Sequence, residues 1–358
     1  MNKFCLVTTL ALLTSVGFAQ HPGRTSENTE KLAELLKKYP QMDQNKDGIL
    51  TMEEALKARD QRTQRKPRQA PRMHSLTPTY SDVSYGDYPS MKLDFWKAES
   101  KEPTALFVWI HGGGFRGGDK APANSLLLEK FLANSVSVAS INYRLTDIGP
   151  YPMQMLDSAR AIQFLRSKAA EWNIDPTRVA AGGGSAGSGI SQWLAFHDDL
   201  AEPESNNPVL RQSTRLSCAL ALNMQSTYDP RVIKEIIPGT AYANNALPAF
   251  YGLPDDWNLL TDEIDTDLDA LMKDASPINH LTGDDPPVFA FHSERTRTPG
   301  NIHHPNFGNH LESAMKKLGL ECIRRTDADY EAPNAQYDEM VEFALKHLDV
   351  ATEAGAED

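Results

Sequence analysis

The chain has 358 residues, a formal net charge of −12 at pH 7 and 40% hydrophobic residues. This length allows one large domain with its own core and a small additional unit. The acidic balance opposes binding to nucleic acid or to an anionic membrane surface, because both would repel the chain at long range.

The first 19 residues have the pattern of an export signal. Lys3 supplies the charged start, an apolar run extends from Leu6 to Leu13, and the small residues Gly17 and Ala19 precede Gln20. The apolar run is shorter than the roughly 20 residues that span a bilayer. We therefore expect residues 1–19 to be a signal peptide and the mature protein to be secreted or periplasmic, with no membrane span; the alternative is an N-terminal anchor.

Residues 25–60 form a predicted helical module around an acidic loop. A helix with leucines on one face is expected at 25–39, and the following residues match D-x-[DN]-x-[DN]-G-x5-E. This segment resembles a single EF-hand, and the resemblance implies a structural calcium ion. The alternative is an acidic helix-turn-helix without metal. The expected ligands are Asp43, Asn45, Asp47, Ile49, Thr51 and Glu54, with Gly48 permitting the tight turn.

A basic, proline-containing linker is expected at 61–79, and a solvated spacer is favoured over an anchor to an acidic polymer. Residues 80–350 then alternate between predicted strands and helices, and 351–358 form an acidic tail. Repeated crossovers predict an α/β fold with a mostly parallel, twisted sheet covered by helices on both faces. The expected strands are 91–96, 105–110, 136–142, 179–181, 216–222, 287–292 and 320–323.

A serine stands at the end of one predicted strand, in the sequence Gly183-Gly184-Ser185-Ala186-Gly187. The G-x-S-x-G pattern is typical of a sharp strand-to-helix turn that exposes the hydroxyl at the edge of the sheet. The small neighbours are needed because side chains there would collide with the adjacent strand or helix. We expect Ser185 to be a nucleophile.

A second glycine-rich turn, His111-Gly112-Gly113-Gly114, follows the predicted strand at 105–110. Such a turn supplies backbone N–H groups to an oxyanion hole, together with the residue after the nucleophile. The expected donors are Gly112, Gly113, Gly114 and Ala186.

Four motifs carry a family resemblance: HGGGF at 111–115, INYRL at 141–145, the D-x-x-R-A-I-x-F-L-R helix at 157–166, and NIDPTRV ahead of GGGSAG. With them, the chain from about residue 85 to the last helix resembles an α/β-hydrolase of the hormone-sensitive-lipase and feruloyl-esterase-like group. The resemblance implies a serine carboxylesterase that acts on a small-molecule or polysaccharide ester and needs no cofactor for catalysis. The second half of the domain matches less well.

The resemblance also implies the chain order serine, acid, histidine, with the acid after strand 287–292 and the histidine after strand 320–323. Asn301 stands where the aspartate belongs, and residues 324–333 contain no histidine. An alternative function follows from these gaps, namely a hydrolase-fold protein that has lost turnover and binds a carbohydrate or protein.

Three histidines are expected at the carboxyl edge of the sheet: His292, His303 and His304. The interpretation that keeps the chain order is a triad of Ser185, Asp229 and His304, with Glu294 as a second candidate acid. The adjacent histidine pair could also hold zinc, although it lacks typical ligand spacing.

Two cysteines, Cys218 and Cys322, lie in apolar stretches of the predicted mature chain. Buried free thiols are favoured over a disulfide between them.

Overall fold

The computed structural model describes residues 33, 36, 37, 40, 43–51, 54, 76–121 and 124–351. The chain divides into two compact units, Met1–Pro71 and Arg72–Asp358, and each is considered by itself. The predicted signal peptide lies outside the described residues, as do most of the expected first helix and linker and nearly all of the acidic tail.

In the first unit, the acidic loop is wound around the side chain of Asp43. Its carboxylate accepts hydrogen bonds from the backbone N–H groups of Lys46 at 2.7 Å and Gly48 at 2.9 Å. Gly48 has a φ of +83°, which favours glycine. At the end of the loop, the carboxylate of Glu54 accepts a hydrogen bond from the backbone N–H of Thr51 at 3.1 Å.

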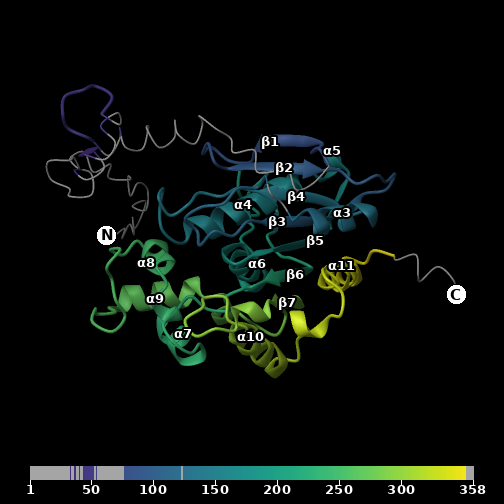
Figure 1. The fold of residues 1–358 in the computed structure, drawn as a ribbon. Coiled ribbons are helices and arrows are strands. Elements are labelled where there is room, and N and C mark those ends of the chain that lie inside the picture. Colours follow the sequence, from purple (N-terminus) through teal and green to yellow (C-terminus); the bar gives the residue numbers. More distant parts are fainter. Residues whose placement is uncertain are drawn as a thin grey trace, which may run out of the picture. The chain divides into compact units, whose positions relative to one another are not determined.

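The second unit contains an eight-stranded sheet with the order β1-β2-β4-β3-β5-β6-β7-β8 (Figure 1). The pairs β1–β2 and β2–β4 are antiparallel, and all other pairs are parallel. The strands are β1 (Tyr80–Ser84), β2 (Lys92–Trp96), β3 (Thr104–Ile110), β4 (Ser137–Ile141), β5 (Ile174–Gly184), β6 (Cys218–Leu222), β7 (Val288–His292) and β8 (Cys322–Thr326).

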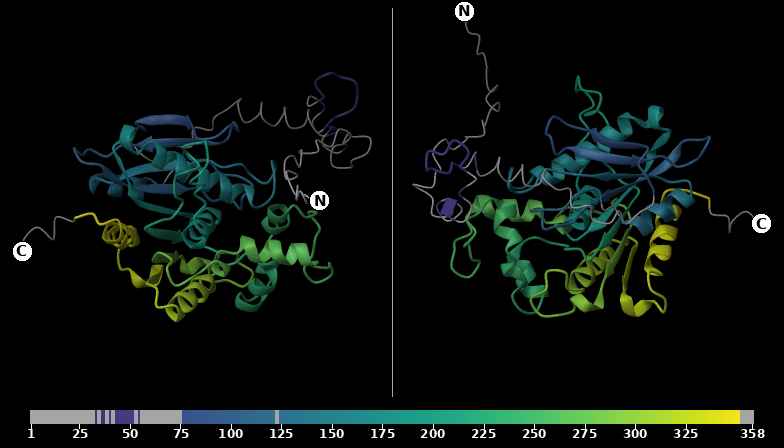
Figure 2. Two further views of the ribbon diagram at one scale, coloured as in Figure 1. Left: turned by 180° about the vertical axis from the view of Figure 1, so that it is seen from behind. Right: turned by 45° about the horizontal axis from the view of Figure 1, so that its top comes forward.

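Helices cover both faces of this sheet (Figure 2). One core packs α3 and α11 against β4, β6 and β7, and a larger core on the other face includes α4, α6 and α10. Burial on both faces explains why the central strands are continuously apolar rather than alternating. The helices are α3 (Ser125–Ala133), α4 (Met153–Ser167), α5 (Ala169–Trp172), α6 (Ala186–Phe196), α7 (Pro230–Ile236), α8 (Ala246–Tyr251), α9 (Thr266–Ala275), α10 (Asn306–Lys317) and α11 (Gln336–His347), with short 3-10 turns between some of them.

The predicted α/β fold is confirmed, and the strand positions agree within a few residues, except that β5 begins earlier, at Ile174. The structure adds an unpredicted edge strand, β1, and the short helices α7, α8 and α9. Both cysteines are free as expected, but only Cys218 is fully buried. Among the described residues, no helix has the length and apolar character needed to cross a bilayer.

Candidate active site

Ser185 occupies the junction between β5 and α6, the sharp turn that its glycine-flanked motif predicts. Its φ of 53° and ψ of −119° are strained for a residue with a side chain. The turn presses closely against β3, because a Cβ added to Gly187 would lie 2.0 Å from the backbone oxygen of Ile110. Strand, turn and helix thus fix the Ser185 backbone at the carboxyl edge of the sheet.

The second glycine turn lies beside the serine. A Cβ added to Gly112 would lie 2.4 Å from the backbone oxygen of Gly184, and Gly113 and Gly114 have φ values of +110° and +60°. Within the described chain, the N–H groups of Gly113, Gly114 and Ala186 have no protein acceptor. Unpaired N–H groups around a serine hydroxyl are what an oxyanion hole requires.

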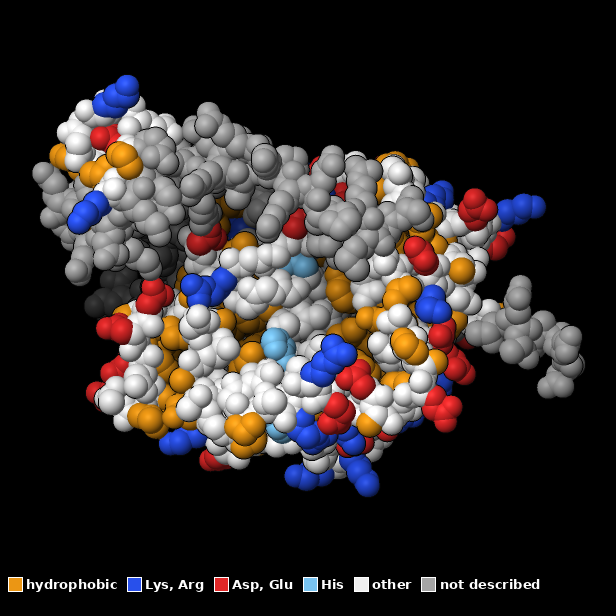
Figure 3. Space-filling model, in the orientation of Figure 1, with side chains coloured by type: hydrophobic (Ala, Val, Ile, Leu, Met, Phe, Trp, Pro, Cys, Tyr) orange, Lys and Arg blue, Asp and Glu red, His pale blue; other side chains and the backbone are white. Residues whose placement is uncertain are grey.

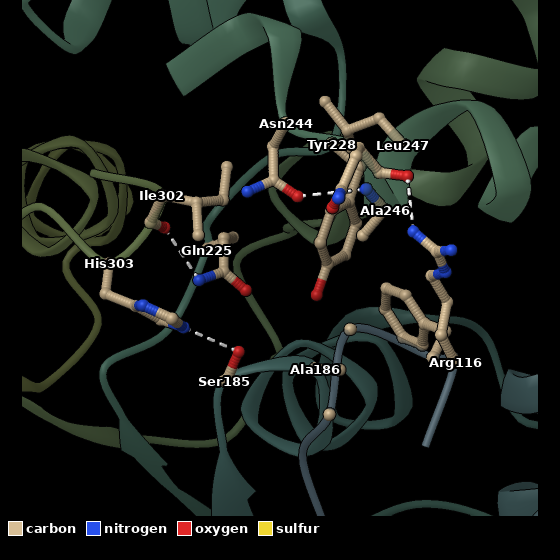
Figure 4. Close-up of a pocket in the computed structure, with 14 residues that line it drawn as sticks. Arg116, Ser185, Ala186, Gln225, Tyr228, Asn244, Ala246, Leu247, Ile302 and His303 are labelled. Atoms are coloured by element: carbon tan, nitrogen blue, oxygen red, sulfur yellow. Dashed lines mark hydrogen bonds between the residues drawn. The ribbon is translucent and has the colours of Figure 1, made fainter. Parts of the chain in front are cut away.

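The imidazole of His303 points at the hydroxyl of Ser185 (Figure 4). His303 Nε2 lies 2.7 Å from Ser185 Oγ, within the range in which a histidine can take a hydroxyl proton. Burial lowers the pKa of His303, which keeps the imidazole neutral at neutral pH. A neutral Nε2 accepts the serine O–H, so the ring hydrogen belongs on Nδ1.

His304, the histidine expected beside the serine, lies elsewhere in the structure. Its Nδ1 accepts a hydrogen bond from the backbone N–H of Asn306 at 3.1 Å, at the start of α10. The expected geometry is therefore corrected by one residue, from His304 to His303. The loop backbone sets this choice, because the Asn301 side chain accepts the His303 N–H at 2.9 Å and the Asn301 carbonyl accepts the His304 N–H at 3.1 Å.

The carboxylate of Asp229, the expected acid, bonds to Arg231 and not to a histidine. It caps the start of α7 through the N–H of Arg231 at 2.9 Å, and its Oδ2 lies 2.6 Å from the Arg231 guanidinium. Glu294 is likewise paired with Arg297, which lowers the pKa of Glu294 to about 2. Across the described part of the chain, no carboxylate hydrogen-bonds to His303, so the serine and histidine form a dyad in this structure.

His292 is fully buried at the end of β7. Its Nε2 bonds the Met224 carbonyl oxygen at 3.2 Å, and its Nδ1 has no hydrogen-bond partner among the described residues. Burial lowers the pKa of His292 to about 4. Burial also separates His292 from solvent, and it has no hydrogen bond to Ser185.

A cavity of about 410 Å³ opens over Ser185 and His303. Figure 3 shows histidine side chains in a hollowed part of one face, next to hydrophobic ones. Most of the cavity wall is apolar, and Figure 4 shows His303 and Gln225 next to Ser185 while Arg116 and Leu247 lie on the far side of the cavity. Besides Gly113, Gly114, Ser185, Ala186 and His303, it is lined by Phe115, Arg116, Gln225, Tyr228, Asn244, Asn245, Ala246, Leu247 and Ile302.

Sequence reasoning missed the cavity residues between 225 and 247, because this segment has no motif and weak helical periodicity. One local feature of the sequence could have separated His303 from His304. His304 precedes Pro305 and a helix, a position from which a side chain can bond the first free N–H groups of that helix. Assigning His304 to that role would have left His303 for the serine.

Comparison with known proteins gives a consistent family. Residues 93–298, more than half of the chain, match the BD-FAE family. Two relatives from Mycobacterium tuberculosis are a probable carboxylic ester hydrolase, LipM, 26% identical over 59% of this chain and 46% of its own length, and the carboxylesterase NlhH, 30% identical over 33% of this chain and 36% of its own length. The chain thus spans about half or less of these relatives.

Solved structures share the fold at low sequence identity. A truncated carbohydrate esterase from gut microbiota has a TM-score of 0.61 at 18% identity, covering 78% of this chain and 99% of its own. An esterase from Thermogutta terrifontis has a TM-score of 0.58 at 21% identity, covering 80% of this chain and 98% of its own. The sheet topology, the strand-to-helix turn at Ser185 and the glycine turn agree with these comparisons. The chain therefore has the α/β-hydrolase fold and belongs to the BD-FAE family.

Proposed function

We propose that this protein is a serine carboxylesterase in which Ser185 is the nucleophile and His303 the general base. The observation that carries the proposal is the 2.7 Å approach of His303 Nε2 to Ser185 Oγ. The pair faces a cavity bordered by the unpaired N–H groups of Gly113, Gly114 and Ala186. The esterase names of relatives such as LipM and NlhH support the same reaction.

In the first step, His303 Nε2 takes the Ser185 proton as the hydroxyl oxygen attacks the ester carbonyl carbon. The carbonyl oxygen gains the negative charge, and the glycine-turn and Ala186 N–H groups stabilise it. The tetrahedral intermediate then expels the alcohol, which receives the proton from His303. His303 then takes a proton from water as the water oxygen attacks the acyl-serine carbonyl carbon. This second tetrahedral intermediate breaks its bond to Ser185 Oγ, which takes the proton back from His303, and the acid is released.

The dyad lacks the carboxylate that usually orients the histidine and stabilises its charged form. His303 is held instead through its backbone, by the Asn301 side chain, and by partial burial in the cavity wall. We expect a working enzyme that is slower than one with a complete triad, because the imidazolium that forms during each step has no charged partner.

We infer that the substrate is an ester with a short acyl group. The cavity of about 410 Å³ is at the small end of ligand sites, and the apolar side chains of Phe115 and Leu247 suit an acyl chain. An alcohol part that remains outside could be large, such as a polysaccharide. Two fold neighbours described as a carbohydrate esterase and an acetyl ester-xyloside hydrolase agree with this extension.

The test is hydrolysis of nitrophenyl acetate and butyrate by the purified protein and by Ser185→Ala. We expect measurable turnover in the native protein and none above background in the variant. A fluorophosphonate probe, which labels only an activated serine, separates this function from that of a binding protein without turnover. The missing carboxylate favours that alternative, and absence of both labelling and turnover would establish it over the esterase.

We also propose that the loop at 43–54 binds calcium and that the protein is exported through residues 1–19. The loop's fit rests on Asp43 and Glu54, whose carboxylates are already turned inward by hydrogen bonds to loop N–H groups. Asn45, Asp47, Ile49 and Thr51 would complete an oxygen ligand set. Calcium titration of the chelator-treated protein, compared with Glu54→Gln, tests the ion; N-terminal sequencing of secreted material tests the export.

A further inference from the structure

A second group of chemically active side chains lies outside the candidate active site. His197 follows the last residue of α6, Asp274 is in α9, and His280 follows a 3-10 turn, Pro277–Asn279. One ligand atom from each of the three lies within 4.8 Å of the other two. His197 is 12 residues beyond Ser185, about 18 Å along a helix at 1.5 Å per residue, so the group is separate from the cavity.

Each of the two histidines has one ring nitrogen bonded to a backbone carbonyl oxygen. His197 Nδ1 bonds the Asp198 carbonyl oxygen at 2.9 Å, and His280 Nε2 bonds the Asp274 carbonyl oxygen at 2.6 Å. A carbonyl oxygen can only accept, so these nitrogens carry a hydrogen, and a metal ion would have to bind the other nitrogen of each ring. A backbone carbonyl on one imidazole nitrogen is the usual support of a metal-ligating histidine.

The carboxylate has comparable support. The buried Tyr151 hydroxyl donates to Asp274 Oδ2 at 2.5 Å, and Trp193 Nε1 donates to the Asp274 carbonyl oxygen at 3.1 Å. The Trp193 ring also packs on His197, with ring centroids 4.1 Å apart. The Asp274 side chain remains 54% exposed, which leaves an entry path from solvent.

We propose that His197, Asp274 and His280 bind a zinc ion. Two imidazole nitrogens and one carboxylate oxygen are a ligand set that zinc uses, with water completing a tetrahedron. Zinc–ligand distances of about 2.0–2.2 Å require the three groups to move closer together when the ion binds. The ion would join the end of α6, the helix that begins beside Ser185, to the segment from α9 to His280.

The test titrates zinc chloride into the chelator-treated full chain in competition with a chromophoric chelator. We expect one zinc per chain with a Kd on the order of 10 µM or tighter, that is, about −7 kcal/mol or more favourable. His197→Gln, His280→Gln and Asp274→Asn should each weaken binding at least about tenfold. Zinc should raise the melting temperature of the native protein and not of these variants.

The matched control is His347→Gln, since His347 lies 3.3 Å from one carboxylate, that of Glu321, without a second histidine. It should leave zinc binding unchanged, and so should Ser185→Ala, which separates this proposal from the esterase. Melting curves without zinc check that each variant folds, and three independent ligand variants guard against one that does not. Native protein that binds no zinc at this affinity, or ligand variants that bind as tightly as the native protein, would overturn the proposal.

Discussion

The two sides of the candidate active site are built in different ways. The serine side consists of backbone: a strained residue between β5 and α6, and a glycine turn packed closely against it. The histidine side is a single side chain on the loop between β7 and α10, positioned by hydrogen bonds within that loop. One side is fixed by the packing of the sheet, and the other depends on the path of a few loop residues.

This difference indicates where the site can change. Ser185 cannot shift without moving β3, β5 and α6 together, because Gly187 is in close contact with the Ile110 backbone. His303 can be exchanged for a neighbour, or lose its acid, at the cost of rearranging one loop. The glycine-flanked turn at Ser185 and the glycine turn beside it are therefore retained, whereas Asn301 stands after β7 where the family resemblance implies an aspartate.

Among the loop variants on the histidine side, the largest effect on catalysis should come from His303. His303→Ala removes the group that takes the serine proton, so kcat for nitrophenyl acetate should fall about 10²- to 10⁴-fold. Steady-state kinetics at neutral pH measure this loss.

His304→Ala is the matched control, one residue away. It removes the bond to the Asn306 N–H and should cost about 1 kcal/mol of unfolding free energy, while kcat stays within about threefold. A large kcat loss in His304→Ala with little change in His303→Ala would reverse the assignment made from the 2.7 Å contact.

On the serine side, Gly187→Ala should destabilise the whole domain. The added Cβ would lie 2.0 Å from the Ile110 backbone oxygen, and we expect a loss of about 3 kcal/mol or more, or failure to fold. Gly184→Ala, whose added Cβ meets no atom within 4 Å, should change unfolding free energy by only about 0.5 kcal/mol. Chemical denaturation compares the two, and equal effects would mean that the turn is not closely packed.

The same difference explains what the sequence could predict. Glycines at 112–114 and 183–187 have backbone requirements that few other residues meet, so their pattern alone indicated both turns and the strands before them. The parallel sheet followed from its continuously apolar strands. His303 and His304 were both expected at this edge, but the choice of His304 as the serine's partner was wrong, because adjacent loop residues have the same spacing and only the three-dimensional loop path separates them.

The carboxylate partner of the histidine could not be predicted from the sequence. Asp229 is at the correct edge of the sheet and in the correct chain order, but no sequence pattern showed that Arg231, two residues later, would occupy its carboxylate. The residues of the cavity wall at 225–247 come from short helices that lack a clear apolar period. Their positions depend on packing against the sheet.

A smaller effect tests whether Asp229 acts at a distance on the base. Asp229→Asn weakens the cap of α7 and the pairing with Arg231, so unfolding free energy should fall by about 1–3 kcal/mol. Activity below the melting range should stay within about threefold, because Asp229 does not contact His303. A loss in kcat near that of His303→Ala would instead make Asp229 part of the catalytic unit.

The smallest expected effect concerns the position that holds Asn301. Burial lowers the pKa of His303 below its ordinary value of 6.5, and only the neutral imidazole can take the serine proton. Activity should therefore persist below pH 6.5 and fall as the pH drops through that lowered pKa. Asn301→Asp places a negative charge beside His303, which favours the imidazolium and should move the acid limb of kcat/KM upward by about one pH unit. Asn301→Ala, which removes the acceptor of the His303 N–H without adding charge, should not raise it. An upward shift in both variants would mean that loop disorder, rather than charge, sets the pKa of His303.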